Sequence, residues 1–329
     1  MNIILLSGGS GTRLWPVSGD VRSKQFVKLF KNQDGEYESM VQRMYAAIRR
    51  VDPEARVTIA TAKAQVPLIR EQLGDAVGIS VEPCRRDTFP AIALASLYLH
   101  DVLGAADSEP VVVCPVDPYV EDDYFEALKR LSELAEEGRG KLVLMGMEPT
   151  CPSEKFGYIM TEDTQQVSRV SSFKEKPDAA TAADYIEQGS LWNGGIFAYR
   201  LGYLLVKAHE LIDFTDYRDM YDRYDQMTRI SFDYAVVEKE PDIAVLRFSG
   251  VWKDLGTWNT LTEALPERVI GPALLSEDCR DVSIINETDV PVLAMGVSNL
   301  IISVTSEGIL VSSPDRADAI KPYVEKLRK

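Results

Sequence analysis

The N-terminal stretch of the chain holds a dense set of groups that could bind phosphate. An apolar run from Asn2 to Leu6 predicts a buried strand, and it leads directly into the loop Ser7-Gly8-Gly9-Ser10-Gly11-Thr12-Arg13. Glycines allow backbone conformations in which successive N–H groups face one anion, and a following helix would add its positive end. With the charges of Arg13 and Lys24, we predict that this loop binds the phosphates of a nucleotide. Taken alone, an ordinary turn from strand to helix is the alternative, because neither common Gly-rich fingerprint is matched.

Two aspartates that are distant in the sequence could hold a divalent metal. Asp117 follows the apolar run 110–114, which is typical of a strand buried on both faces, and Asp254 lies between aromatic residues and Gly256. Mg²⁺ accepts carboxylate oxygens beside nucleotide phosphates, and nucleotidyl transfer needs charge neutralised between its attacking and leaving oxygens. For each aspartate taken alone, a turn or a helix N-cap is the alternative.

Two further stretches carry polar groups suited to a sugar phosphate. In Phe173-Lys174-Glu175-Lys176-Pro177, which ends a predicted strand, Glu175 could accept hydrogen bonds from hydroxyls while Lys176 neutralises a phosphate. Leu191-Trp192-Asn193-Gly194-Gly195 combines an amide with small residues, as the floor of a sugar site would. The alternatives are a solvated charged turn for the first stretch and a plain turn into a strand for the second.

Strand and helix signals alternate along the first half of the chain. We predict strands at 57–61, 78–82, 110–114 and 141–147, and helices at 64–73, 90–103 and 122–137. Such alternation predicts an α/β fold with a Rossmann-like, mixed but mostly parallel sheet that has helices on both faces. Ligands of such sheets bind beyond the carboxyl ends of the strands, where the glycine loop would lie.

The pattern changes near residues 266–272, after which short β-rich runs follow one another. They lie at 282–286, 290–295, 300–304 and 308–312, and a charged helix is predicted at 315–327. We therefore predict a catalytic domain over 1–268 and a small β-rich domain with a terminal helix over 269–329. Because short strands bury little surface by themselves, we expect the small domain to pack on the main domain or on another subunit, so a homodimer is an open option.

The bulk composition excludes several classes of protein. A net charge of −15, from 36 basic and 51 acidic residues, argues against a nucleic-acid partner. The sequence has no window of about 18 uncharged apolar residues that would predict a membrane span. Its first apolar run is not preceded by basic residues, so we expect no signal peptide and a cytoplasmic location. The four cysteines are scattered, which indicates neither a zinc site nor a disulfide framework.

The order of the motifs along the chain resembles that of the bacterial mannose-1-phosphate guanylyltransferases, within the sugar-1-phosphate nucleotidyltransferases. The shared blocks are the glycine loop with Leu14-Trp15-Pro16 and Lys24-Gln25-Phe26, Glu82-Pro83 with Arg86-Asp87-Thr88, Asp117 after a strand, Phe156-Gly157-Tyr158, Glu175-Lys176-Pro177, Trp192-Asn193-x-Gly195, Asp233-Tyr234-Ala235-Val236-x-Glu238-Lys239 and Trp252-x-Asp254-x-Gly256. The resemblance runs from Met1 to about Leu265, and the β-rich tail fits the family's small left-handed β-helix domain.

The resemblance implies a reaction and a role for each matching residue. The chain would transfer GMP from GTP to mannose 1-phosphate, by Mg²⁺-assisted in-line attack of the sugar phosphate on the α-phosphorus. The implied nucleotide site comprises Leu6, Ser7, Gly8, Gly9, Ser10, Gly11, Thr12, Arg13 and Lys24 near the phosphates, and Glu82, Arg86, Asp87 and Thr88 near the base and ribose. The implied sugar site comprises Gly157, Glu175, Asn193 and Asp233, with Lys176 on the phosphate, and Asp117 and Asp254 would bind Mg²⁺. The implied catalytic residues are Arg13, Lys24, Asp117, Lys176 and Asp254.

The chain departs from the family's usual pattern in three places. It has Val116-Asp117-Pro118 for Ala-Asp-His, Arg86-Asp87-Thr88-Phe89-Pro90 for Arg-Asn-Thr-Ala-Pro, and Trp192-Asn193-Gly194-Gly195 for Trp-Asn-Ser-Gly. These differences fall in segments that the resemblance assigns to the nucleoside and the sugar. Another nucleotide or another sugar 1-phosphate is therefore an alternative, and so is a catalytically silent protein that binds a sugar nucleotide and regulates a partner.

Overall fold

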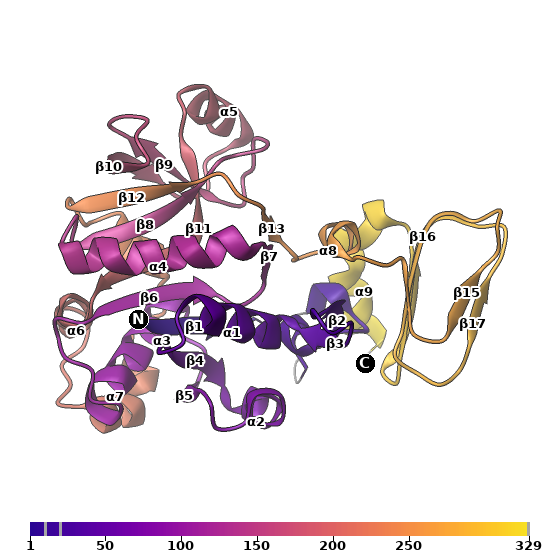
Figure 1. Cartoon of the computed structure of the whole chain (residues 1–329), viewed down its shortest axis with the longest axis horizontal. Coiled ribbons are helices and arrows are strands. Elements are labelled where there is room, and N and C mark those ends of the chain that lie inside the picture. Colours follow the sequence, from indigo (N-terminus) through magenta and orange to yellow (C-terminus); the bar gives the residue numbers. More distant parts are fainter. Residues whose placement is uncertain (10–11, 20–21, 328–329) are drawn as a thin grey trace.

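A computed structural model of the chain describes residues 1–9, 12–19 and 22–327. Its centre is a nine-stranded sheet (Figure 1). From one edge to the other, the strands are β5 (Gly78–Glu82), β4 (Arg56–Ala62), β1 (Asn2–Ser7), β6 (Pro110–Pro115), β11 (Leu191–Arg200), β8 (Leu142–Met147), β12 (Ile243–Phe248), β10 (Val167–Lys174) and β9 (Gly157–Thr161). The predicted α/β class and the predicted strands are confirmed.

The sheet is mixed in direction. β5, β4, β1 and β6 pair in parallel, as do β8 and β12, whereas β11 is antiparallel to both β6 and β8, and β10 is antiparallel to β12 and β9. The predicted mostly parallel arrangement therefore holds only for the first group and for the β8–β12 pair. β9 and β10 follow each other in the chain without an intervening helix, as an antiparallel pair allows.

Helices cover both faces of the sheet because its strands are apolar on both sides. Ile3 and Leu5 of β1 pack in one core with α1 (Met40–Val51), α2 (Val66–Leu73) and α4 (Asp122–Glu137). Ile4, between them, packs in a second core with α3 (Thr88–Leu97), α6 (Leu201–His209) and α7 (Tyr217–Asp222). The same alternation recurs in β6 and β8, which explains their continuous apolar sequences.

The helices begin where the sequence supplies a polar cap. Ser39 and Gln42 form a capping box at the start of α1, Asp178 caps α5 (Ala179–Glu187), and Thr257 caps α8 (Trp258–Ala264). α4 has the predicted bounds. It ends at Gly138, whose φ of 73° suits a residue without a Cβ. In the part of the chain that the structure describes, we find no helix with the length and apolar character that a membrane crossing requires.

Residues 269–327, here called the C-terminal β region, form short paired strands and a final helix. A four-stranded sheet has the order β14 (Val269–Ile270), β16 (Arg280–Asn286), β18 (Ser298–Thr305) and β19 (Gly308–Ser312), and β15 (Ala273–Leu275) pairs in parallel with β17 (Val292–Ala294). β14, β16 and β18 are parallel to one another. The predicted β-rich tail is thus confirmed. The boundary at residue 268 and the left-handed β-helix stay predictions.

The C-terminal β region packs on the main body, as one of the two expected arrangements requires. A third apolar core joins Ile270, Ile285 and Ile301 to residues of α8, of α9 (Ile320–Leu327) and of the segment after the glycine loop. Two small β ladders complete this side of the molecule, β2 (Lys28–Lys31) with β3 (Tyr37–Ser39) and β7 (Pro118–Val120) with β13 (Trp252–Asp254). Figure 1 shows β15, β16 and β17 extending away from the nine-stranded sheet beyond α8, with α9 beside α8.

Candidate active site

The glycine loop follows the carboxyl end of β1, between β4 and β6 in the sheet. Of the predicted phosphate-binding residues, Gly8 and Gly9 are exposed, Arg13 is exposed on a single 3-10 turn over residues 12–14, and Ser7 and Leu6 belong to the strand. Ser10, Gly11 and the side chain of Thr12 lie outside the described residues. The position matches the rule that ligands bind at the carboxyl ends of parallel strands.

A buried polar network supports the base of this loop. Gln25 donates to the Ser7 hydroxyl at 3.0 Å, and Gln65 donates to the Ser23 hydroxyl at 2.6 Å. Ser23 in turn donates to the Gly9 carbonyl at 2.8 Å, and Thr61 donates to Gln65 Oε1 at 2.6 Å. Buried polar groups that are all paired fix one conformation, so this network positions the loop backbone.

Lys24 brings together the two aspartates that the sequence proposes as metal ligands. Its Nζ lies 2.8 Å from Asp117 Oδ2 and 3.6 Å from Asp254 Oδ1. Asp254 is opposite Pro118 in the β7–β13 ladder, which places it beside Asp117 although the two residues are far apart in the sequence. The alternative reading of Asp117 as a helix N-cap is wrong, because α4 begins after Glu121.

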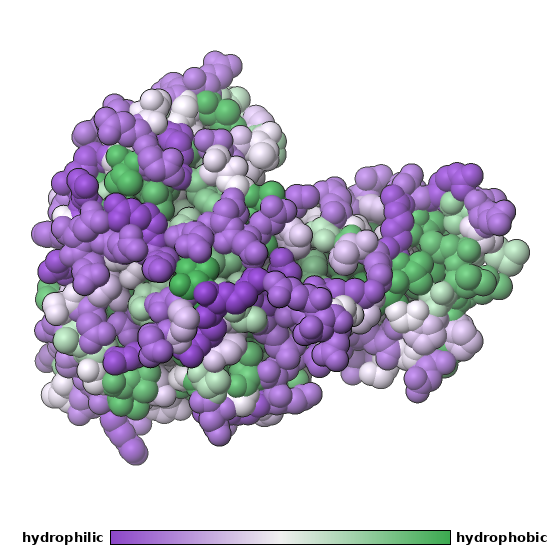
Figure 2. Space-filling view, viewed as in Figure 1, coloured by the Kyte–Doolittle hydropathy of each residue, from purple (hydrophilic) through white to green (hydrophobic). Residues whose placement is uncertain are grey.

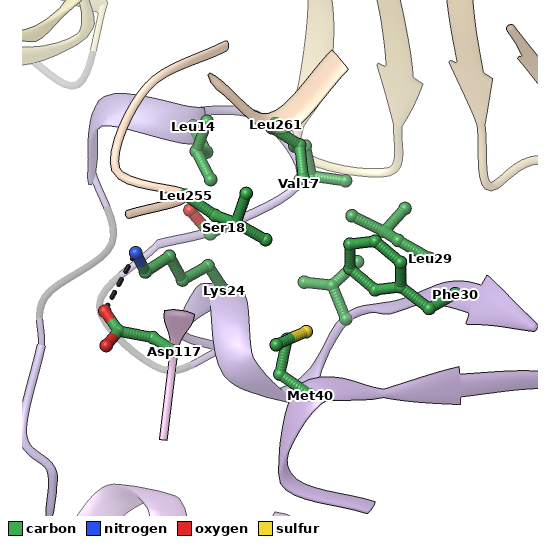
Figure 3. A pocket seen from close by; sticks show the side chains of 11 residues that line it. Leu14, Val17, Ser18, Lys24, Leu29, Phe30, Met40, Asp117, Leu255 and Leu261 are labelled. Atoms are coloured by element: carbon green, nitrogen blue, oxygen red, sulfur yellow. Dashed lines mark ion pairs between the residues drawn. The ribbon is translucent and has the colours of Figure 1, made fainter. Parts of the chain in front are cut away.

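The Lys24 side chain reaches these carboxylates along the wall of an apolar pocket. Leu14, Val17, Leu29, Phe30, Met40, Leu255 and Leu261 line this pocket (Figure 3). The lysine side chain is 16% exposed, whereas those of Asp117 and Asp254 are 36% and 42% exposed. The methylenes are therefore packed, and only the ammonium group faces the open side of the site.

The two carboxylates suit a magnesium ion that also binds a nucleotide. Within the described residues no group of three or more histidine, cysteine, aspartate or glutamate side chains is arranged to hold a metal. Mg²⁺ is commonly bound through one or two carboxylates together with substrate phosphates and water, so Asp117 and Asp254 alone fit that ion. Gly256 leaves the needed room, since a Cβ at that position would lie 2.9 Å from Asp254 Oδ2.

In the segment predicted to face the nucleoside, Glu82 is partly buried whereas Asp87 is exposed. Glu82, at the carboxyl end of β5, accepts a hydrogen bond from Tyr224 at 2.8 Å, and burial raises its pKa. A Cβ added to Gly8 would lie 3.8 Å from Glu82 Oε1, so the glutamate stands beside the glycine loop. Asp87 has a φ of 72° and accepts from the Thr88 N–H at the start of α3.

Arg86 and Thr88 have partners within the protein. The Arg86 guanidinium donates to the Asp225 carbonyl, and Thr88 Oγ1 accepts from the Phe232 N–H at 2.8 Å. Both residues therefore hold the segment 225–232 against the start of α3. Phe89 is fully buried and stacks on Phe232, so this departure from the family's pattern belongs to the core.

The residues predicted to hold a sugar form one group. Asn193 of β11 is opposite Gly157 of β9 and donates from Nδ2 to Asp233 Oδ1 at 2.6 Å. Lys176 donates to Glu175 Oε1 at 2.6 Å. Gly157 has no room for a side chain, because a Cβ there would lie 2.6 Å from Glu175 Oε2. Asn193 is also opposite Gly146 in β8, so this group lies at the same edge of the sheet as the glycine loop.

Asp233 carries the most perturbed carboxyl of this group. Burial, and next the nearby Glu175 carboxylate, raises its pKa from 3.8 to about 6, against the opposing effects of Asn193 and Lys176. Lys176 has its pKa raised by its hydrogen bond to Glu175. The charged form of Asp233 is therefore costly in the folded protein without a ligand.

Sequence reasoning missed Ser23 and Gln65, whose hydrogen bonds support the glycine loop. Gln65 is 42 residues from Ser23, and its neighbourhood has no pattern typical of a site. A buried glutamine at the start of α2, close to the carboxyl end of β4, becomes informative only once the strand order is known.

We predict that Asp233→Asn stabilises the protein at pH 8 and has little effect at pH 4. A carboxyl whose pKa is raised on folding stabilises the fold at low pH, and this contribution is lost as the pH rises from about 4 through about 6. The gain in unfolding free energy at pH 8 should be about 1 to 3 kcal/mol. Thermal and denaturant unfolding at both pH values would measure it, with the exposed Asp213→Asn as the matched control. Equal stability of Asp233→Asn and the wild type at pH 8 would contradict the raised pKa.

Comparisons with known proteins identify the family of the chain. The Nucleotidyl transferase family profile matches residues 2–268. The mannose-1-phosphate guanylyltransferase RfbM of Salmonella typhimurium is 31% identical over 356 residues, which cover 99% of this chain and 72% of that protein. The xanthan biosynthesis protein XanB of Xanthomonas campestris is 30% identical over 352 residues, which cover 99% of this chain and 73% of XanB.

Solved structures lead to the same family. A Thermus thermophilus protein, described as a mannose-1-phosphate geranyltransferase, superposes with a TM-score of 0.80 at 28% identity, over 100% of this chain and 99% of that one. A UDP-glucose pyrophosphorylase, at 16% identity and a TM-score of 0.56, shares the fold. The chain is an enzyme that belongs to the nucleotidyl transferase family.

Proposed function

We propose that the chain transfers GMP from GTP to mannose 1-phosphate, releasing GDP-mannose and pyrophosphate. The observation that carries the proposal is the joint position of two charged groups at one edge of the sheet: Lys24 with Asp117 and Asp254, and Lys176 with the Glu175–Asn193–Asp233 cluster. The first group suits a triphosphate and the second a sugar phosphate. The names of the relatives supply the choice of guanine and of mannose.

The reaction is a single in-line displacement. An oxygen of the sugar phosphate attacks the α-phosphorus, a new P–O bond forms, and the bond between the α-phosphorus and the oxygen bridging to the β-phosphorus breaks. The electron pair of that bond leaves with pyrophosphate, so no covalent enzyme intermediate and no oxidant are required. Mg²⁺, when bound by Asp117 and Asp254, would neutralise the negative charge that shifts from the attacking oxygen to the leaving pyrophosphate.

The chain's own residues would bind and orient the two substrates. The glycine loop and Arg13 would hold the triphosphate, and Lys24 would turn from its carboxylates toward phosphate oxygens. Lys176 would hold the sugar phosphate, while the carboxylates of Glu175 and Asp233 would accept hydrogen bonds from hydroxyls. Catalysis is then positioning together with charge stabilisation.

Two alternatives are open at the level of substrate and activity. The same chemistry could use another sugar 1-phosphate or another nucleotide, because Asp87 and Gly194 depart from the family's pattern. A silent regulator that binds a sugar nucleotide is less favoured, since Arg13, Lys24, Asp117, Lys176 and Asp254 are all retained.

The function is tested by pyrophosphate release with Mg²⁺, crossing GTP, ATP, CTP, UTP and dTTP with mannose, glucose and galactose 1-phosphates. We expect the highest kcat/KM for GTP with mannose 1-phosphate. A higher value for another pair would keep the chemistry and reassign the substrate. No release from any pair, by folded protein that binds nucleotide in calorimetry, would favour the regulatory alternative.

We predict that Asp254→Asn lowers kcat by at least about a hundredfold, because a neutral amide neither balances Lys24 nor binds Mg²⁺ well. The unfolding temperature should change little, since this side chain is 42% exposed and not part of an apolar core. Mn²⁺ binding in the presence of GTP, followed by electron paramagnetic resonance, should weaken in parallel. Asp213→Asn is the control that removes an exposed carboxylate elsewhere. Activity of Asp254→Asn within threefold of the wild type would remove this residue from the proposed metal site.

We also propose that a second copy of the chain docks on an apolar face of the C-terminal β region. Leu274 and Leu293 are register neighbours in the β15–β17 pair, and with Val290 and Met295 they are all more than 60% exposed. Figure 2 shows hydrophobic residues gathered over this end of the molecule. A contiguous exposed apolar face of this kind is typical of an interface.

We predict that the wild type is a dimer in light scattering at micromolar concentration, and that Leu274→Ser with Leu293→Ser gives a monomer. The double variant exposes no further apolar surface, so its fold should be retained. Val206→Ser, at an exposed apolar residue of α6, is the matched control. A monomeric wild type, or a double variant that is still dimeric, would contradict this interface.

A further inference from the structure

The segment that follows the glycine loop is buried in a core shared with the C-terminal β region. Leu14 and Val17 are each 2% exposed and belong to the same apolar cluster as Ile285 of β16 and Ile301 of β18. The residues between Arg13 and Ser18 therefore lack a core of their own. Part of the core that holds them comes from strands that lie outside the part of the chain matched by the family profile, residues 2–268.

Backbone contacts hold the same segment. Thr305 Oγ1, at the end of β18, donates to the Pro16 carbonyl at 3.4 Å, and the Trp258 indole of α8 donates to the Trp15 carbonyl at 3.3 Å. The turn after β18 comes closest at Gly308, where an added Cβ would lie 2.5 Å from Trp15 Cζ2. Gly308 also has a φ of 151°, so it is the residue type that both the backbone and the contact require.

An ion pair fixes the other end of the segment. Arg22 donates from both terminal nitrogens to the two carboxylate oxygens of Glu287, at 2.5 and 2.8 Å. A bidentate pair of this kind sets the orientation of a guanidinium as well as its distance. Arg22 is two residues before Lys24 and one before Ser23, which donates to the Gly9 carbonyl.

We propose that the C-terminal β region acts as a brace for the phosphate-binding machinery, with Glu287, Thr305 and Gly308 as positioning residues. Thr305 and Gly308 hold the chain directly after Arg13, and Glu287 holds the chain directly before Ser23 and Lys24. The brace acts on nucleotide binding, because its contacts go to the segment after the glycine loop. The residues proposed to hold the sugar lie elsewhere: Gly157 on β9, Asn193 on β11, Glu175 and Lys176 directly after β10, and Asp233 after α7. This inference rests on the proposed function to the extent that the ligand of the loop is a nucleoside triphosphate.

The ion pair allows a test in which restored charge complementarity separates positioning from direct binding. We expect Glu287→Arg and Arg22→Glu each to raise the Kd of GTP in calorimetry and its KM by about fivefold, with a smaller change in kcat. The KM of the sugar 1-phosphate should change less than twofold. The double variant Arg22→Glu with Glu287→Arg should return the Kd and KM of GTP to within about twofold of the wild type, because the pair is reformed with its charges exchanged.

The matched control is the exposed ion pair between Arg268 and Asp281, in which a guanidinium nitrogen lies 3.0 Å from a carboxylate oxygen. Among the described residues, this pair makes no link to the segment after the glycine loop. Arg268→Asp and Asp281→Arg should leave the Kd of GTP unchanged. Thermal unfolding of every variant separates a loss of stability from a loss of positioning. A second probe, Thr305→Val, removes the hydrogen bond to the Pro16 carbonyl without changing charge. It should also weaken the binding of GTP more than the binding of the sugar phosphate.

Each outcome decides the inference. Single variants that bind GTP like the wild type would overturn it, as would single variants that lose only stability. Weak binding by Arg22→Glu that Glu287→Arg does not rescue would assign Arg22 to the nucleotide itself and would also overturn it. A wild type that binds GTP but transfers nothing would refute the proposed reaction, and the same calorimetric rescue would still support the brace. A wild type that binds no nucleotide would refute both.

Discussion

The contact on which the site depends is the one between the Lys24 ammonium group and the carboxylates of Asp117 and Asp254. It joins the chain after the glycine loop, the turn between β6 and β7, and the short strand β13. Two carboxylates placed side by side repel each other, and the lysine balances them while its methylenes stay in the apolar pocket. The same contact suits both phosphate binding and metal binding. A phosphate can attract the lysine, and a divalent cation can then replace the ammonium group between the two carboxylates.

This arrangement lets a strongly acidic protein bind anionic substrates. The net charge of −15 gives no general attraction for phosphate, and salt screens exposed charges beyond about 10 Å. Attraction must therefore come from a few cations close to the ligand, and Arg13, Lys24 and Lys176 lie at the same edge of the sheet as the exposed backbone of Gly8 and Gly9. Two of these cations, Lys24 and Lys176, already have carboxylate partners, so phosphate has to compete with those carboxylates.

Sequence reasoning could predict the elements and the groups of residues, because both follow from local patterns and from the order of motifs. The α/β class, the strand at Pro110–Pro115 and the helix at Asp122–Glu137 follow from periodicity. The pairing of Asp117 with Asp254 is implied by the family resemblance alone, and the β7–β13 ladder shows how the fold produces it. The support of the loop by Gln65 and by Glu287 could not be predicted. These contacts join segments far apart in the chain, and a lone glutamine or glutamate is normally read as a surface residue.

The departures from the family's usual pattern differ in their physical consequences. Phe89 is fully buried against Phe232, and Pro118 is buried on β7, where it faces Asp254 in the ladder. Such residues change packing beneath the site, whereas Gly194 lies in the irregular part of β11 directly after Asn193 and can change how close a sugar approaches. Asp87, exposed and at a positive φ, lies at the start of α3. Differences in substrate choice between this chain and its relatives should therefore come from Asp87 and Gly194 rather than from Phe89 or Pro118.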